Sequence, residues 1–317
     1  MDLIALAPQL LGFRPRDSVL LMTFGGPEGC FHARVDLPVD PEGQQEVTGL
    51  MVGAAARNRV GAAAVLVFST DAEASRAQAR LLVEGLTGAS VDVLDVVRVE
   101  EDRYFRPLEH DESGTPYDVS AHPFTARRVF EGQVVQPSRE ALADTLVGTD
   151  EADRAAVLDA VAAQGPASFG RGRGREARWV QACLRRGAGG PPLGVADAAR
   201  LLVACTEAGL RDVAWAEMSR ENAATHVDLW RDLVRRAPTD QLPPAAALLG
   251  FAAWLAGDGA LAWCAVDRCL EVDPDYSLAH GVGELLTRAV PPSTWEQIPQ
   301  TALAALDRAG LLSMHGT

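Results

Sequence analysis

The sequence predicts an α/β domain with a mixed sheet over residues 1–150, followed by an all-α helical domain over residues 151–317. Two observations carry this prediction. In the first part, apolar runs of strand length alternate with amphipathic stretches of helix length. In the second part the apolar pattern is helical, and its breaks are marked by proline and glycine. A chain of 317 residues is long enough for two separate cores.

The first elements form a hairpin and a helix. The apolar runs Ser18–Phe24 and Cys30–Leu37 are joined by a glycine-rich turn, which predicts two antiparallel strands. Glu42–Arg59 has apolar residues at helical spacing and predicts a helix.

A strand, a helix and a second hairpin follow. Ala62–Ser69 is apolar throughout, which is typical of a strand buried on both faces. Thr70-Asp71-Ala72-Glu73 has the pattern of a capping box and predicts a helix that runs to about Leu86. Val91–Val99 is the next predicted strand, with Asp102–Leu108 as its hairpin partner. Strand, helix and strand with short joints imply a parallel pair, so the sheet as a whole is predicted to be mixed.

The middle of the chain is less regular. Ala121–Glu131 predicts a short helix, and Ser138 is placed to cap the next one. Gly165–Gly174 contains four glycines and predicts a flexible joint. Six arginines lie between Gly170 and Arg186, and we expect this basic stretch to dock on the acidic first domain. Nucleic-acid binding is the alternative, but no aromatic residues alternate with the arginines to stack on bases.

A spacing pattern in the second domain predicts helical hairpins. Small residues let two helices approach closely, and a proline ends the second helix of the pair. These features resemble a tetratricopeptide repeat of about 34 residues, carried here by Leu249, Gly250, Ala262, Cys269 and Pro274. A fainter copy ends at Pro238, so we expect such hairpins over about residues 209–290. Two repeats are fewer than an independent solenoid needs, so they must pack on something else.

Composition excludes several classes of chemistry. The chain has no lysine, which removes Schiff bases, P-loop lysines and serine–lysine dyads. A net charge of −14 disfavours nucleic acid and anionic membranes as partners. The cysteines are odd in number and form no CxxC pair, which predicts neither a zinc site nor a disulfide framework and favours the cytoplasm. No cofactor is expected.

Three clusters of polar residues are candidate sites. Arg14 could clamp an anionic ligand while Asp17 orients it, or the two could simply fix the chain before the first strand. His32 and Asp36 share a strand face but are roughly 13 Å apart, which favours a solvated face over a catalytic pair. The polar loop from His110 to His122 matches no metal-ligand spacing, so no metal is expected there.

Four ordered motifs resemble a known family. They are Leu10–Ser18, Gly114-Thr115-Pro116-Tyr117-Asp118 with His122-Pro123, Pro137-Ser138-Arg139, and Ala253–Ala260 followed by Asp273–Ala279. In this order they resemble the actinobacterial family called domain of unknown function 4192. The resemblance implies a bacterial cytoplasmic protein and supplies no activity, cofactor or catalytic residue.

Two functions remain open. The leading hypothesis is a protein–protein interaction or self-association through the helical domain. The alternative is an enzyme or small-molecule-binding protein, whose site on the α/β domain would gather Arg14, Asp17, Thr115, Tyr117, His122 and Arg139. Convergence of these side chains on a concave pocket would favour the alternative.

Overall fold

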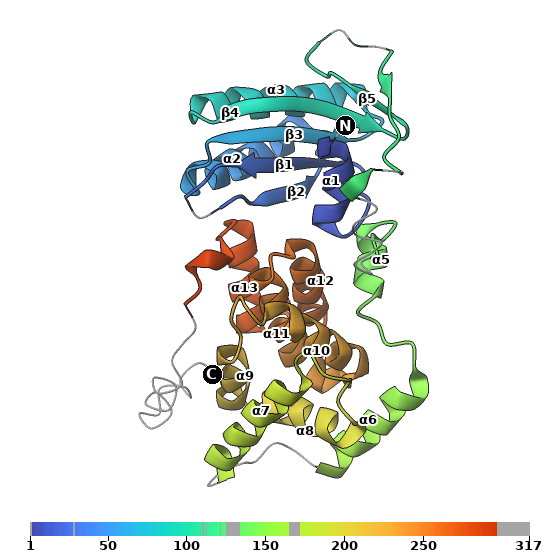
Figure 1. Cartoon of the computed structure of the whole chain (residues 1–317), viewed down its shortest axis with the longest axis vertical. Helices are drawn as coiled ribbons and strands as arrows, with labels where there is room; N and C mark the ends of the chain where they lie inside the picture. The colour runs from blue at the N-terminus through green and yellow to red at the C-terminus, as the bar shows by residue number, and fades with distance from the viewer. Residues whose placement is uncertain are drawn as a thin grey trace. The chain divides into compact units, whose positions relative to one another are not determined.

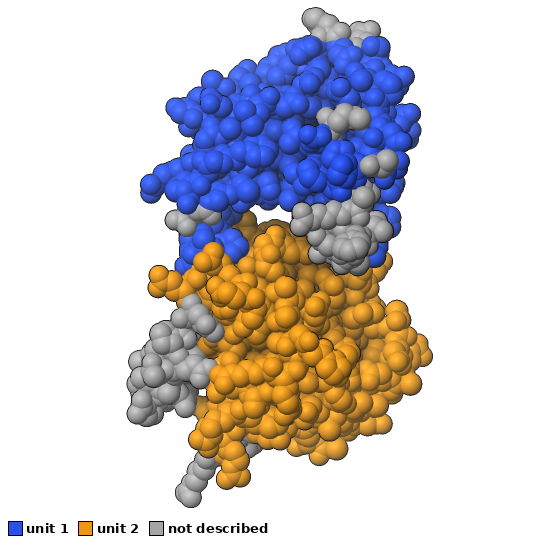
Figure 2. Space-filling view, in the orientation of Figure 1, with its two compact units in different colours: residues 1–142, 287–294 blue, residues 143–286, 295–317 orange. Residues whose placement is uncertain are grey.

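The structure is a computed structural model that describes residues 2–27, 29–109, 111, 113–120, 122–124, 134–164 and 172–296. The chain forms two compact units (Figure 2). Unit 1 contains residues up to Leu142 together with Thr287–Thr294, and unit 2 contains Ala143–Leu286 together with Trp295 and Glu296. Residues 143–150, which the sequence assigns to the first domain, thus belong to unit 2, and a short C-terminal segment returns to unit 1.

Unit 1 contains a six-stranded mixed sheet with the order β2-β1-β3-β4-β5-β6 (Figure 1). β1 pairs antiparallel with β2 and with β3, whereas β3 and β4 are parallel. β5 and β6 add antiparallel strands at the far edge. The strands are β1 (Ser18–Phe24), β2 (His32–Asp36), β3 (Ala62–Phe68), β4 (Asp92–Glu100), β5 (Arg103–Phe105) and β6 (Thr115–Pro116). The predicted mixed sheet is confirmed.

Helices cover both faces of the central strands. α2 (Pro41–Arg57) and α3 (Ala72–Gly88) pack on one face, where Val19 and Val65 meet Met51 and Leu82. α1 (Asp2–Leu11) lies on the opposite face (Figure 1). Since β1 and β3 are apolar on both faces, every residue of β1 before Phe24 is buried.

Carboxylate caps fix the starts of α2 and α3. Asp40 accepts a hydrogen bond from the N–H of Gly43 at 2.8 Å, and Pro41 opens α2. Asp71 accepts from the N–H of Ala74 at 2.9 Å. The sequence pattern placed the cap of α3 at Thr70, which is wrong by one residue, because the Asp71 carboxylate is the group that satisfies a free N–H of the first turn.

Unit 2 is built from packed helices, as predicted. α10, α11 and α12 pack in sequence, and α6 packs on α8. All fourteen residues of α11 are buried. The helices of this part of the chain are α6 (Glu151–Gln164), α7 (Arg173–Gly187), α8 (Val195–Cys205), α9 (Ala208–Ala216), α10 (Ala223–Arg236), α11 (Leu242–Leu255), α12 (Gly259–Leu270) and α13 (Ser277–Thr287), with a 3₁₀ turn η2 (Thr239–Gln241). α5 (Arg139–Asp144) contains the boundary between the units, and the 3₁₀ turn η3 (Pro292–Thr294) belongs to unit 1.

The contact between α11 and α12 explains the small residues in the repeat pattern. A Cβ added to Gly250 would lie 3.4 Å from the carbonyl oxygen of Ala262, and Ala262 and Cys269 are fully buried. Larger side chains at these positions would push the helices apart. The resemblance to tetratricopeptide repeats stays a prediction.

No described helix has the length and apolarity that a membrane span requires.

The arginines of α7 and of its partner helices form ion pairs within unit 2. Arg173 pairs with Glu207, Arg185 bonds Glu217 at 3.0 Å, and Glu176 of α7 bonds Arg200 at 2.8 Å. These residues therefore have partners within unit 2, and the expected docking of the basic stretch on the acidic domain stays a prediction. Residues 165–171 of the predicted joint, and residues 121 and 125–131 of the predicted short helix, lie outside the described residues.

A buried histidine makes unit 2 sensitive to acid. His226 on α10 is 2% exposed, and within the described chain its Nδ1 has no hydrogen-bond partner. Burial lowers the pKa of His226 from 6.5 to about 4, because a charged imidazole would lose its hydration there. The folded chain therefore stays neutral at this residue where the unfolded chain takes up a proton.

We expect unit 2 to lose stability as the pH falls from 6.5 towards 4, by up to about 3 kcal/mol from this group. The pKa of His226 is lower in the folded chain than in the unfolded chain. The free energy of unfolding therefore begins to fall when the pH drops to the pKa of the unfolded chain. His226→Met should flatten this pH dependence relative to the parent, whereas His280→Gln at an exposed position should not. All six tryptophans lie in unit 2, so urea titrations followed by tryptophan fluorescence report on it. If the free energy of unfolding changed equally with pH in the parent and in His226→Met, this account would be contradicted.

Candidate functional site

A cavity of about 950 Å³ lies in unit 1 at the carboxyl ends of β3 and β4. We call it the α1 cavity, because α1 forms one wall through Ile4, Ala5, Pro8 and Gln9. Its other walls come from the chain before β1, the ends of β3 and β4, the β4–β5 turn, and two later segments. Those residues are Arg14, Pro15, Arg16, Asp17, Phe68, Ser69, Thr70, Val99, Glu100, Glu101, Asp102, Tyr117, Asp118, Val119, Ser120, Val134 and Val135.

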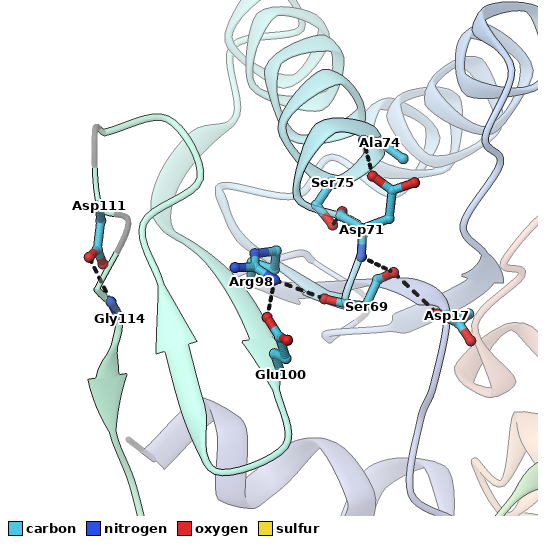
Figure 3. Close-up of polar contacts among 9 residues, drawn as sticks. All are labelled: Asp17, Ser69, Asp71, Ala74, Ser75, Arg98, Glu100, Asp111 and Gly114. Carbon is cyan, nitrogen blue, oxygen red and sulfur yellow. Dashed lines mark hydrogen bonds and ion pairs between the residues drawn. The ribbon is translucent and has the colours of Figure 1, made fainter.

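A polar network under the cavity ties these walls together (Figure 3). The hydroxyl of Ser69 donates to the Asp17 carboxylate at 3.2 Å and accepts from the N–H of Asp71 at 3.1 Å. The carbonyl of Ser69 accepts a hydrogen bond from the Arg98 guanidinium at 3.2 Å. Ser69 therefore links the chain before β1, the start of α3 and β4 at a single point.

Arg98 is the buried charge of this network. Its guanidinium is 2.5 Å from a Glu100 oxygen and stacks over the Phe105 ring, 3.8 Å from the ring centre. A charge that is 7% exposed is tolerated only because it is paired and hydrogen-bonded. Sequence reasoning missed Arg98; the only available signal was an arginine inside a strand of apolar residues.

The Gly114–Asp118 motif holds the β4–β5 turn. The Tyr117 hydroxyl donates to the carbonyl of Glu101 at 2.8 Å, and its N–H donates to the carbonyl of Asp102 at 2.9 Å. Burial, and next the Asp102 charge, raise the pKa of Tyr117, so the phenol stays protonated and available as a donor. The motif thus places Tyr117 and Asp118 at the cavity.

A second long-range contact closes the wall beside α1. Phe13 forms a parallel bridge with Gln136. The N–H of Arg14 donates to the carbonyl of Gln136 at 2.9 Å, and the N–H of Gln136 donates to the carbonyl of Gly12 at 2.8 Å. This bridge joins the first motif of the sequence to the residue just before the third and brings Val134 and Val135 to the cavity.

The structure brings together three of the six residues named for the small-molecule alternative. Arg14, Asp17 and Tyr117 line the α1 cavity. Thr115 instead pairs with Tyr104 in the β5–β6 ladder, and the ring of His122 bonds the Asp2 carboxylate at 3.1 Å. Arg139 begins α5. None of these last three lines the cavity.

The other polar clusters have structural partners. Asp111 accepts hydrogen bonds from the N–H groups of Gly114 and Arg106, and these bonds lower the pKa of its carboxyl group. Asp36 pairs with Arg34 at 2.6 Å and not with His32, whose pKa is lowered by burial. His32 is thus more buried than the predicted solvated face implied. The described residues contain no group of three ligands suited to a metal, while His110 and Glu112 lie outside them.

Gly114 is required by both conformation and space. Its φ is +62°, in the left-handed region, and an added Cβ would lie 2.5 Å from the Phe105 ring. The ring cannot retreat freely, because the Arg98 guanidinium stacks over it.

We expect Gly114→Ala to destabilise unit 1 by about 2–3 kcal/mol, from the left-handed backbone and from overpacking of the ring. Gly88→Ala is the matched control, since its Cβ would meet open space and its backbone is not left-handed. Urea unfolding followed by far-ultraviolet circular dichroism measures both. A Gly114→Ala variant as stable as Gly88→Ala would show that the Gly114–Phe105–Arg98 stack does not hold the β5–β6 arm in place.

Comparison with known proteins confirms the resemblance to domain of unknown function 4192. The family model described as domain of unknown function (DUF4192) matches residues 1–293. No curated protein and no solved structure matches the chain. The family carries no assigned role, so the roles of the cavity residues must come from their geometry. Since the match extends through both compact units, the chain belongs to the DUF4192 family, a domain of unknown function.

Proposed function

We propose that unit 1 binds a small organic molecule in the α1 cavity. The observation that carries this proposal is the convergence of Arg14, Asp17 and Tyr117 on one concave site at the carboxyl ends of two parallel strands. In open α/β sheets this edge is where ligands bind. The volume of about 950 Å³ lies within the range of small-molecule sites.

The lining has the composition of a binding site. Apolar side chains such as Ile4, Phe68 and Val99 supply surface that a ligand can bury. Hydroxyl, carboxylate and guanidinium groups converge on the same space and can fix a ligand's orientation. No histidine or cysteine is among the lining residues that the structure describes, so binding is better supported than nucleophilic catalysis.

Backbone strain also gathers at the cavity. Asp17 has a φ of +38° and Glu101 a φ of +44°, and both line the cavity. Left-handed conformations of non-glycine residues are costly and occur often at functional sites, where the surrounding structure enforces them. Here the carbonyl of Asp17 accepts the N–H of Leu37, and the carbonyl of Glu101 accepts the Tyr117 hydroxyl.

The helical unit supports a second proposal, a surface for a protein partner or for a second copy of the chain. Stacked helix pairs such as α10 to α12 commonly bind other chains. Val147 and Leu158 are large apolar side chains of this unit that are 41% and 53% exposed. This proposal ranks second because two separated side chains make no continuous apolar patch. Light scattering across a concentration series tests for self-association.

We expect compounds from a small-molecule library to raise the melting temperature of the protein by binding the folded state. Thr70→Trp, which adds an indole to the cavity wall, should abolish these shifts because it occupies the ligand's space. Thr87→Trp is the control, since Thr87 is exposed near the end of α3 and outside the cavity. Scanning fluorimetry of the three proteins measures the shifts. Equal shifts in all three, or no shift from any compound, would argue against a ligand site at the α1 cavity.

A further inference from the structure

The charges at the α1 cavity fall into two groups. Three carboxylates already have partners in the protein. Asp17 accepts from Ser69, Glu100 pairs with Arg98, and Asp118 accepts from the N–H of Ser120 at 2.8 Å. These groups build the walls of the cavity.

Four other charged side chains at the cavity have no such partner. Arg14 and Arg16 on one segment, and Glu101 and Asp102 on the β4–β5 turn, make no side-chain hydrogen bond or ion pair with the part of the chain that the structure describes. Two cations and two anions remain for a ligand. All four side chains are exposed, so they stand at the mouth of the cavity and not at its floor.

Tyr117 lines the cavity together with a residue from each pair of charges, Arg14 and Asp102. The Asp102 charge raises the pKa of the Tyr117 phenol, whereas the Arg14 charge lowers it. The carbonyl of Asp102 also accepts the Tyr117 N–H at 2.9 Å. A ligand seated beside Tyr117 would meet a guanidinium and a carboxylate together.

The rest of the cavity lining is mostly apolar, and a hydroxyl group without a partner neighbours it in the sheet. Ser18 is fully buried, and within the described chain its Oγ makes no hydrogen bond. Ser18 stands opposite Phe68 in the β1–β3 ladder, so both side chains point to the same face of the sheet. Phe68 lines the cavity together with Ile4 and Pro8. Pro8 has no N–H, so the carbonyl of Ile4 lacks its usual helical donor on this wall.

We propose that the ligand is a small zwitterion with an apolar body, of the amino-acid or short-peptide class. Its anionic group would lie at Arg14 and Arg16, its protonated amine at Glu101 and Asp102, and its apolar body against Phe68 and α1. A ligand that carries one anionic and one cationic group matches the two cations and two anions that the site leaves without partners. This inference rests on the α1 cavity being a ligand site and adds the ligand's chemical class.

Three forms of one dipeptide test the inference. Leucyl-leucine with free termini, its N-acetyl form and its C-terminal amide are titrated into the full chain by calorimetry. Because exposed ion pairs are weak, each capped form should bind about three- to fivefold more weakly than the free dipeptide. Raising the salt concentration should reduce this preference.

Charge-removing variants assign each end of the ligand. Arg14→Gln should bind the free dipeptide and its C-terminal amide equally well. Asp102→Asn should bind the free dipeptide and its N-acetyl form equally well. Arg80→Gln and Asp92→Asn remove the same charges at exposed positions outside the cavity and should bind like the parent. Melting temperatures confirm that the variants are folded.

The outcomes separate this inference from the proposed function. Binding of all three dipeptide forms with equal affinity, or of none while other compounds bind in a Thr70→Trp-sensitive way, would overturn the zwitterion class and leave the ligand site standing. Dipeptide binding that Thr70→Trp does not change would overturn both. Loss of each preference in its own variant alone would support the assignment.

Discussion

The buried guanidinium of Arg98 is the interaction on which the architecture of unit 1 depends. It bonds the carbonyl of Ser69, the residue just after β3, pairs with Glu100 at the end of β4, and stacks on the Phe105 ring of β5. A single charged group thus joins three adjacent strands at the edge where the α1 cavity opens. Removing one of its partners would leave a buried charge unpaired, which costs several kcal/mol. The partners are therefore as important to unit 1 as the guanidinium itself.

The surrounding motifs follow from that constraint. Gly114 must have no side chain, because the Phe105 ring that packs on Arg98 lies against its Cα. The chain can then continue into β6, and the Tyr117 hydroxyl can donate a hydrogen bond to the carbonyl of Glu101 in the β4–β5 turn. On the other side, Ser69 extends the network to Asp17 and to the cap of α3. The cavity is the space these contacts leave between the sheet edge and α1.

The local part of this fold could be read from the sequence, and the long-range part could not. The two hairpins, the buried strand Ala62–Phe68 and the helices on either side of it were predictable, because each shows in its own apolar spacing. The Phe13–Gln136 bridge joins residues more than a hundred positions apart and has no local signature. The same limit applies to the site: of the residues that the sequence suggests for a ligand site, Arg14, Asp17 and Tyr117 line the cavity, but nothing in the sequence could tell them from His122, which bonds Asp2 instead.

Hydrogen–deuterium exchange of an Arg98→Met variant tests most directly whether this guanidinium holds the cavity together. Methionine can pack on Phe105 but cannot bond the Ser69 carbonyl or pair with Glu100. We expect faster exchange at the amides of Ser69 to Ala74 and of Arg103 to Tyr117, with the amides of α10 to α12 in unit 2 unchanged. Exchange at the parent's rate in both unit 1 segments would contradict the central role given to Arg98.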